Sequence, residues 1–264
     1  MAAGQRWTRN ELLLALHLYW RLPFGQQHSH HPAVIELADV LGRTPSSVAM
    51  KLNNFTSLDP VEKSRGIVGL QGASALDREI WAWHRAMGVE AAAEMEALWQ
   101  IQVEHQGVAD VLPVDPSFEL PTFAGASTSA QARATVRRGQ EFFRRTVLAN
   151  YQGKCALTGL GHPALLRASH IVGWAEAPQE RVSVRNGIAL NAMHDAAFDR
   201  HLMTFDDDGR MVIGKRLADG IGQSELVSGF LAYQGRTLTA AFRTAPNPEL
   251  FARHRKRFLE LEAA

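Results

Sequence analysis

The apolar residues of the first hundred positions recur at intervals of three and four, the spacing of helices with one buried face. The first such helix begins after Thr8, which has Glu11 at the capping-box position. A second begins at Pro32 and ends at Gly42. The first helix has one predicted apolar face, which consists of Leu12, Leu13, Leu16, Tyr19 and Trp20. The N-terminal part of the chain is therefore predicted to be helical.

A third helix follows after three residues, with Thr44 as its N-cap and Pro45 at its first position. Its apolar face is formed by Val48, Leu52 and Phe55. Two capped helices joined by a short turn with Gly resemble a helix-turn-helix. On that interpretation Lys51 contacts phosphate, and Asn53 or Asn54 contacts base edges or phosphate. The alternative is a small helical packing unit that binds no ligand.

The stretch 109–130 has three prolines, then small polar residues, and no helical period. Such composition is typical of a linker. The sequence therefore predicts a helical recognition domain over residues 1–107, a linker over 108–132 and a second domain over 133–264.

The second domain combines helices with short strands. The pattern predicts helices over 133–150 and 191–200, and strands over 165–172 and 187–190. A hairpin with strands 203–205 and 211–213 follows. The chain is thus expected to be an α+β protein, with an all-helical, helix-turn-helix-like first domain.

The formal net charge of the 264 residues is only +1, yet the charges are segregated. Residues 96–132 hold five acidic and no basic residues, whereas 133–158 hold six basic residues and one acid. Two arginine pairs lie in this basic segment, namely Arg137, Arg138, Arg144 and Arg145. They are candidate contacts to DNA phosphates, with a solvated helix face as the alternative.

Several motifs of the second domain occur in the order found in one nuclease family. They are Arg138-Gly139-Gln140, Phe143-Arg144, Cys155 to Gly159, Ala168-Ser169-His170-Ile171 with Trp174, Asn186 to Leu190, His194, Ala197 to Arg200, Pro248-Glu249-Leu250 and His254-Arg255. Residues 133–258 thereby resemble an HNH endonuclease, of the subgroup whose first motif is Ser-His-Ile. The resemblance implies a ββα-metal fold made of a strand, a second strand and a helix.

The resemblance also assigns roles to individual residues. His170 would be the general base that activates water. Asn186 would bond backbone across the loop between the strands and hold His170 in place, although an ordinary Asn-Gly turn is a competing interpretation. His194 would bind one divalent ion, with Asp195 or Asp199 as a second ligand. Alternatively, Asp199 caps the helix or pairs with its neighbour, Arg200.

The expected metal site is poor in protein ligands. Ser169 stands where many HNH enzymes have an acidic ligand, and the single cysteine, Cys155, excludes a zinc knuckle and an internal disulfide. Mg²⁺ or Mn²⁺ suits such a site best, and a transition metal on His194 is an alternative. One cysteine, no signal-peptide pattern and no long apolar run indicate a cytoplasmic protein without a membrane span.

Together these features predict a metal-dependent endonuclease that cleaves double-stranded DNA. By analogy of architecture, we expect a restriction enzyme for DNA with 5-methyl- or 5-hydroxymethylcytosine, acting as a homodimer. Two alternatives remain. One is a non-catalytic DNA-binding regulator with a degenerate HNH fold, and the other is a homing or phage-type nickase that cuts unmodified DNA.

Overall fold

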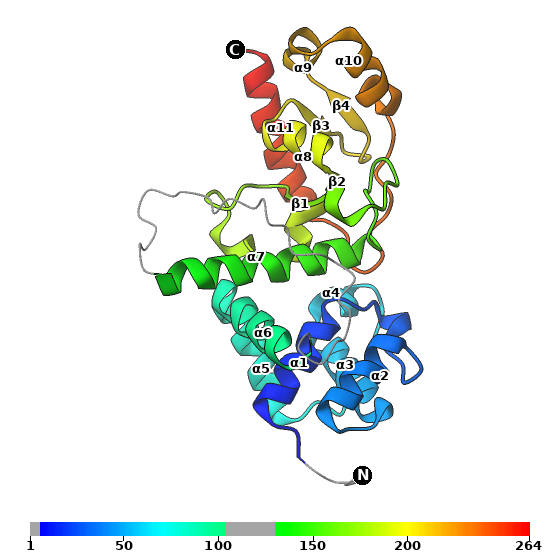
Figure 1. The fold of residues 1–264 in the computed structure, drawn as a ribbon, viewed down its shortest axis with the longest axis vertical. Coiled ribbons are helices and arrows are strands. Elements are labelled where there is room, and N and C mark those ends of the chain that lie inside the picture. Colours follow the sequence, from blue (N-terminus) through cyan, green and yellow to red (C-terminus); the bar gives the residue numbers. More distant parts are fainter. Residues whose placement is uncertain (1–5, 104–129) are drawn as a thin grey trace. The chain divides into compact units, whose positions relative to one another are not determined.

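The computed structural model describes residues 6–103 and 130–264. The chain divides into two compact units, residues 1–142 and 143–264, and the division falls within one long helix, α7 (Figure 1). Most of the predicted linker, 108–132, lies outside the described residues, and its last three residues begin α7. In the described part of the chain, no helix is long and apolar enough to span a membrane.

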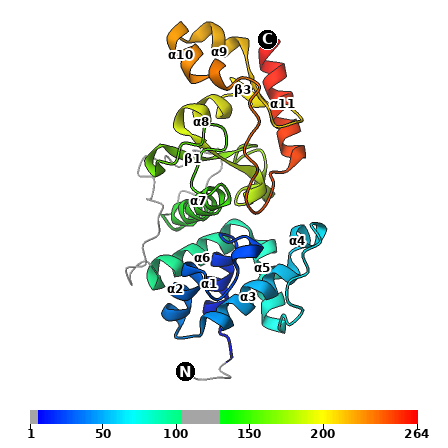
Figure 2. The ribbon, with the colours of Figure 1, turned by 90° about the vertical axis from the view of Figure 1, so that its right-hand side faces the viewer.

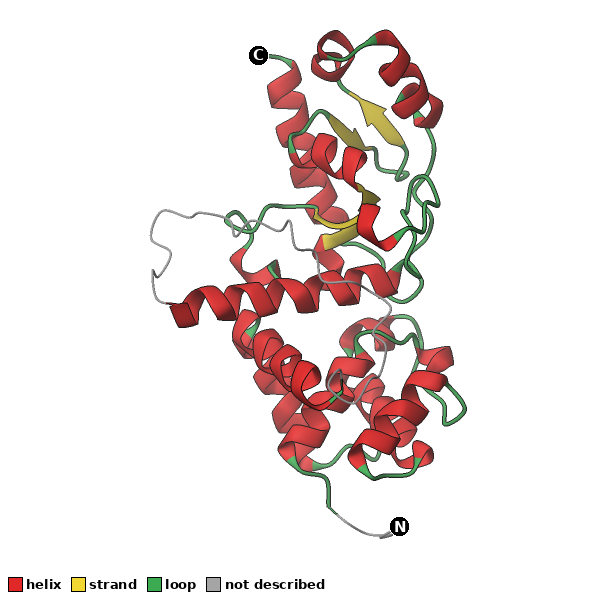
Figure 3. Ribbon diagram, in the orientation of Figure 1, coloured by secondary structure: helices red, strands yellow, loops and turns green. Residues whose placement is uncertain are grey.

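The described part of the first unit consists of helices and connecting loops and has no strand (Figure 3). Its helices are α1 (Arg9–Tyr19), α2 (Pro32–Leu41), α3 (Pro45–Leu58), α4 (Pro60–Ser64), α5 (Ala75–Met87), α6 (Val89–Gln102) and the start of α7 (Ala130–Asn150). The predicted starts are confirmed, because Thr8 forms the capping box with Glu11 and the Thr44 side chain accepts from the Ser47 backbone N–H. Gly42 ends α2 in the left-handed region, at φ 63°.

Helix α1 forms the centre of this unit rather than one of its faces. Every residue from Leu12 to Tyr19 is buried, and the helix packs against α2, α3, α5 and α6. The prediction of a single apolar face was therefore too narrow, because a helix covered on all sides needs no polar face. The buried His17 of α1 has its Nε2 2.9 Å from the buried Glu96 carboxylate.

Of the three α3 residues predicted to contact DNA, Lys51 and Asn54 are buried and Asn53 is half-buried. Lys51 is only 7% exposed, and its Nζ lies 2.9 and 3.0 Å from the two carboxylate oxygens of the buried Asp77. Asn53 donates to the carbonyls of Gln27 and Ala49, both at 2.8 Å. An uncompensated buried charge is costly, so Lys51 cannot leave Asp77 cheaply to reach a phosphate.

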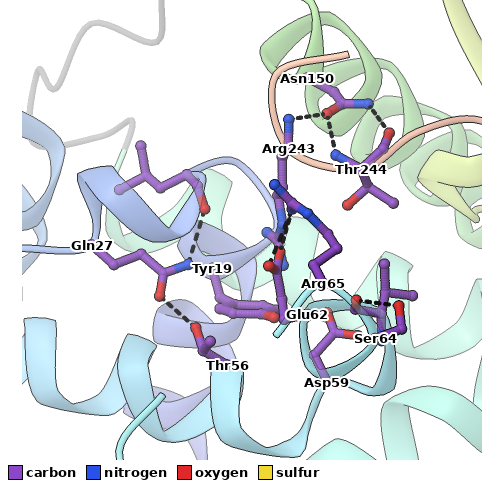
Figure 4. Close-up of polar contacts among 12 residues, drawn as sticks. Tyr19, Gln27, Thr56, Asp59, Glu62, Ser64, Arg65, Asn150, Arg243 and Thr244 are labelled. Carbon is purple, nitrogen blue, oxygen red and sulfur yellow. Dashed lines mark hydrogen bonds and ion pairs between the residues drawn. The ribbon is translucent and has the colours of Figure 1, made fainter. Parts of the chain in front are cut away.

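Asn54, the third predicted contact of α3, is 2% exposed and donates to the Gly72 carbonyl. Neighbouring polar groups are joined in the same way (Figure 4). The Thr56 hydroxyl donates to Gln27 Oε1 at 2.7 Å, and the Gln27 amide donates to the Leu22 carbonyl. The polar side of α3 thus stabilises the unit from within, so we do not retain these three residues as DNA contacts.

The second unit has the mixed composition predicted for it. After the end of α7 come β1 (Leu166–His170), β2 (Gly187–Asn191), α8 (Ala192–Asp199), β3 (Met203–Phe205), β4 (Met211–Ile213), α9 (Lys215–Gly220), α10 (Gln223–Gly229) and α11 (Pro248–Glu262). Antiparallel β1–β2 and β3–β4 form two separate sheets. Figures 1 and 2 show β1 between α7 on one side and α8 on the other.

The end of α7 is fixed to the chain that precedes α11. The Asn150 amide donates to the Thr244 carbonyl at 2.8 Å, and Asn150 Oδ1 accepts from the backbone N–H groups of Arg243 and Thr244, both at 3.0 Å (Figure 4). At the other end of this segment, Asn247 caps α11. These bonds hold α7 in place beside the β1–β2 sheet.

The four arginines of α7 do not form one exposed cluster. Arg145 is 4% exposed, and Arg144 donates to the carbonyls of Leu166 and Pro163 at 2.9 and 3.2 Å. Only Arg137 and Arg138 are exposed, and Arg137 also forms an ion pair with Glu141. The prediction that all four contact phosphates is therefore wrong for the second pair, because side chains at successive positions of a helix point in different directions.

Candidate active site at the end of strand β1

The two strands of the predicted motif pair along their whole length and place His170 opposite Gly187. His170 is the last residue of β1, and Gly187 is the first of β2. Consecutive strand residues point to opposite faces. Ser169 reaches α8, whereas the His170 ring lies on α7. The end of β1 therefore contacts both flanking helices, α8 through Ser169 and α7 through His170.

The imidazole of His170 is held on three sides. It stacks on Phe143 of α7 with ring centroids 3.9 Å apart, and its edge meets the Trp174 ring at 5.9 Å. Its Nε2 donates to the Arg181 carbonyl at 2.9 Å. Burial lowers the pKa of His170 to about 4, so the ring is neutral near pH 7. Because a carbonyl only accepts, the single ring proton is on Nε2.

The other ring nitrogen of His170 has an unused lone pair. Nδ1 has no hydrogen-bond partner among the described residues, and the residue as a whole is half-buried. A neutral imidazole with its Nε2 proton committed to a carbonyl presents Nδ1 as an acceptor. The geometry is that of a general base, which needs an accessible lone pair held in a fixed direction.

The close packing under His170 depends on Gly187. A Cβ atom at this position would lie 2.3 Å from Val147 Cγ2 and 2.9 Å from Phe143 Cζ. The absent side chain lets α7 approach β2 closely enough for Phe143 to lie flat against His170. Gly187 is therefore a spacing residue of the candidate site.

Asn186 closes the loop that joins β1 to β2. It is completely buried, its Oδ1 accepts from the Val172 N–H at 2.9 Å, and its amide donates to the Val172 and Glu180 carbonyls. The backbone N–H of Ile171, the residue after His170, also donates to the Asn186 carbonyl. These bonds fix the backbone on both sides of the base and of Arg181, whose carbonyl binds it.

His194 does not have the free nitrogen that a metal ligand requires. It is fully buried, its Nδ1 accepts from the Asn191 amide at 2.8 Å, and its Nε2 donates to the Gly229 carbonyl at 2.8 Å. Both ring nitrogens are thereby used to join the start of α8 to the end of α10. These bonds occupy the nitrogens that would bind a metal ion, and the ligand role of His194 stays a prediction.

The carboxylates of α8 lie one turn apart, at Asp195 and Asp199. Ser169 donates to Asp195 Oδ1 at 2.5 Å, so the serine orients a carboxylate instead of supplying one. Burial raises the pKa of Asp195, and the charge of Asp199 raises it further. Asp199 is exposed and makes no hydrogen bond or ion pair in the described part of the chain. The neighbouring Arg200 donates to the Ala196 carbonyl instead.

This donor set fits a hard divalent cation bound mainly through water. Among the described residues, no group of three His, Cys, Asp or Glu side chains forms a complete metal cluster. Mg²⁺ and Mn²⁺ are commonly held by one or two carboxylates, with waters and phosphate oxygens as further ligands. The mutual repulsion of Asp195 and Asp199 is the property that a bound cation relieves. The two aspartates, rather than His194, fit the ion.

Sequence reasoning missed the groups that position the base. Phe143 and Gly187 were quoted only as parts of motifs, and Arg181 acts through a backbone carbonyl that no side-chain pattern reveals. Ser169 was regarded as a missing ligand. Its position beside His170 at a strand end, with two aspartates on the next helix, is the signal that could have indicated its contact with Asp195.

Two comparisons with known proteins bear on this site. The sequence profile of the HNH endonuclease family matches residues 155–206, a segment that contains β1, β2 and α8. A search of curated proteins found no match. HNH nucleases generally use divalent metal ions and act on DNA. The matched segment, 52 of the 264 residues, is therefore similar to an HNH endonuclease domain and indicates nuclease activity on DNA.

Proposed function

We propose that the protein is a metal-dependent DNA endonuclease whose general base is His170. The observation that carries this proposal is the single unused nitrogen of a neutral, clamped imidazole at the end of β1, close enough to Asp199 of α8 for the charge of this carboxylate to act on the ring. Phosphodiester hydrolysis needs a water molecule that loses its proton as it attacks phosphorus. His170 Nδ1 would accept that proton, while the Nε2 proton of the ring stays bonded to the Arg181 carbonyl.

The remaining residues act by position. Phe143 and the Arg181 carbonyl fix the plane and the tautomer of the base, and Asn186 fixes the loop that carries that carbonyl. Ser169 fixes Asp195. Asp195 and Asp199 would hold Mg²⁺ or Mn²⁺, which supplies positive charge to the scissile phosphate and the leaving oxygen.

The proposed substrate is double-stranded DNA that contains 5-methyl- or 5-hydroxymethylcytosine. The argument is one of architecture, since a separate helical unit with a helix-turn-helix-like α2–α3 pair precedes the nuclease-like segment in the chain. The unit with the nuclease motif contains one candidate active site in its described part, at His170. A double-strand break therefore requires two protein molecules or two successive cuts, and we propose a homodimer.

The test uses the full chain on plasmids that differ only in cytosine modification. Wild-type protein is incubated with unmodified, methylated and hydroxymethylated plasmid in Mg²⁺, in Mn²⁺ and in EDTA. The proposal predicts linear product from the modified plasmids with either metal and no product in EDTA. Equal cleavage of all three plasmids would exclude dependence on modification and favour the nickase alternative. DNA binding without cleavage under any metal would favour the non-catalytic regulator.

A further inference from the structure

The inward orientation of Lys51, Asn53 and Asn54 leaves the first unit without the DNA contacts predicted for it. A different part of this unit has a hollow of about 520 Å³. It lies between the end of α3, α4, the loop 65–73 and the first turn of α5, and is lined by Ser57, Leu58, Lys63, Gly66, Ile67, Val68, Gln71 and Arg78.

The charges around this hollow have one sign. Its lining contains two cations, Lys63 and Arg78, and no carboxylate. Both are exposed and neither forms an ion pair in the part of the chain that the structure describes. Other cations of the unit do form such pairs, namely Arg9 with Glu94, Arg43 with Glu11, Lys51 with Asp77 and Arg65 with Glu62. The hollow thus has an uncompensated positive charge.

The loop 65–73, which forms one wall of the hollow, is held in place by contacts with α3 and α4. Gly69 has φ +64°, and a Cβ atom there would lie 2.6 Å from the Asn53 carbonyl oxygen, so the loop backbone lies directly on α3. The Leu70 N–H donates to that same carbonyl, and the Ile67 N–H donates to the Glu62 carbonyl. This anchored loop nevertheless exposes an apolar side chain, because Val68 is 60% accessible.

We propose that this hollow binds a backbone phosphate of a DNA strand. Lys63 and Arg78 would hold the anion, and the apolar wall at Ile67 and Val68 would pack against the adjoining sugar or base. The assignment rests on the proposed action on DNA. It moves the DNA-binding surface of the first unit from the polar residues of α3 to the loop 65–73 and its flanking helices.

The test measures the salt dependence of DNA binding by the full chain. A fluorescent duplex with 5-methylcytosine is titrated in EDTA, where cleavage is absent, at several salt concentrations. Each phosphate contact that is lost lowers the slope of log affinity against log salt by about 0.9. For the double variant Lys63→Ala/Arg78→Ala we expect about tenfold weaker binding and a slope lower by about 0.9, because the two cations hold one phosphate.

The matched control is Arg6→Ala, which removes an exposed cation of the same unit outside the hollow. It should leave the slope unchanged. Val68→Asp is a second probe, since a carboxylate on this exposed side chain places negative charge beside the hollow without disturbing the core. It should weaken binding as the double variant does.

The site proposal and the nuclease proposal fail in different ways. Wild-type cleavage of plasmid combined with an unchanged salt slope in the double variant would overturn the phosphate site alone. A reduced slope in the double variant, combined with a wild-type protein that cuts no DNA, would support the site and refute the nuclease.

Discussion

Helix α3 and the end of β1 were both predicted to be functional because polar residues stand on a recognisable motif. In α3, those residues use their hydrogen-bonding groups inside the unit, as Lys51 does with Asp77 and Asn53 with two carbonyls. At the end of β1 and at the end of α8, His170 and Asp199 retain capacity for further partners. A polar residue within a motif is thus a better functional candidate when its neighbours leave part of its bonding capacity unused.

The same criterion separates the two histidines of the nuclease-like segment. Both are surrounded by aromatic rings, His170 by Phe143 and Trp174, and His194 by Phe230 and Tyr233. Both ring nitrogens of His194 form hydrogen bonds, to Asn191 and Gly229, whereas only one ring nitrogen of His170 does. We infer that His194 ties helices together and that His170 is the reactive one.

The largest effect is expected where a buried pair is broken. Lys51→Met leaves the buried Asp77 carboxylate without its cation, which should lower the free energy of unfolding by about 3–5 kcal/mol. Urea denaturation followed by circular dichroism measures it. Lys63→Met, at an exposed lysine, is the control and should change stability little. A Lys51→Met protein of normal stability but weakened DNA binding would restore the predicted outward role.

Removing one carboxylate from α8 tests the candidate active site, the second region of the comparison. Asp199→Asn should lower the rate of plasmid cleavage about 100-fold and raise the Mg²⁺ concentration needed, with unchanged stability, because the side chain is exposed. Asp219→Asn, at another exposed aspartate, serves as the control. Normal cleavage by Asp199→Asn at limiting Mg²⁺ would remove this residue from the metal site.

The spacing role of Gly187 predicts a coupled loss. Gly187→Ala forces Val147 and Phe143 away from β2, so it should destabilise the protein by about 1–3 kcal/mol and slow cleavage through a displaced His170. Gly161→Ala is the control, because a Cβ atom there meets only ordinary contacts at 3.7 and 3.8 Å. Destabilisation without slower cleavage would separate the packing of α7 from the orientation of the base.

Buried histidines predict a smaller effect of acid. Burial lowers the pKa of His84, His170 and His254 to about 4, against 6.5 for the unperturbed group. Below pH 6.5 the unfolded chain takes up protons that the folded chain takes up only near pH 4. The free energy of unfolding therefore decreases as the pH is lowered. Each of these histidines should lower the free energy of unfolding by about 1 kcal/mol when the pH is lowered from about 7 to about 5.5.

Urea denaturation at these two pH values checks that loss. His84→Phe should reduce it by about one third, since this ring lies among aromatic side chains and a phenyl group fills a similar space. Stability that does not change over this range would contradict the lowered pKa values.

Local patterns in the sequence predicted the elements well. Capping residues such as Thr8 and Thr44, the left-handed Gly42 and the hairpin 203–205/211–213 depend on neighbours a few positions away. The orientation of Lys51 depends on Asp77, and that of Asp195 on Ser169, each 26 residues distant. No periodicity within one helix encodes such a partner, so the sequence could name candidate residues but not the contacts that these residues make.

The central claim is that His170 is the base, and the rate of plasmid cleavage by His170→Ala tests it most directly. Wild type and variant are compared in Mg²⁺ on the same modified plasmid, with equal melting behaviour as the check on folding. The account predicts a rate lower by about 10²–10⁴-fold, the usual contribution of a general base. A folded His170→Ala protein that cleaves within tenfold of the wild-type rate would contradict it.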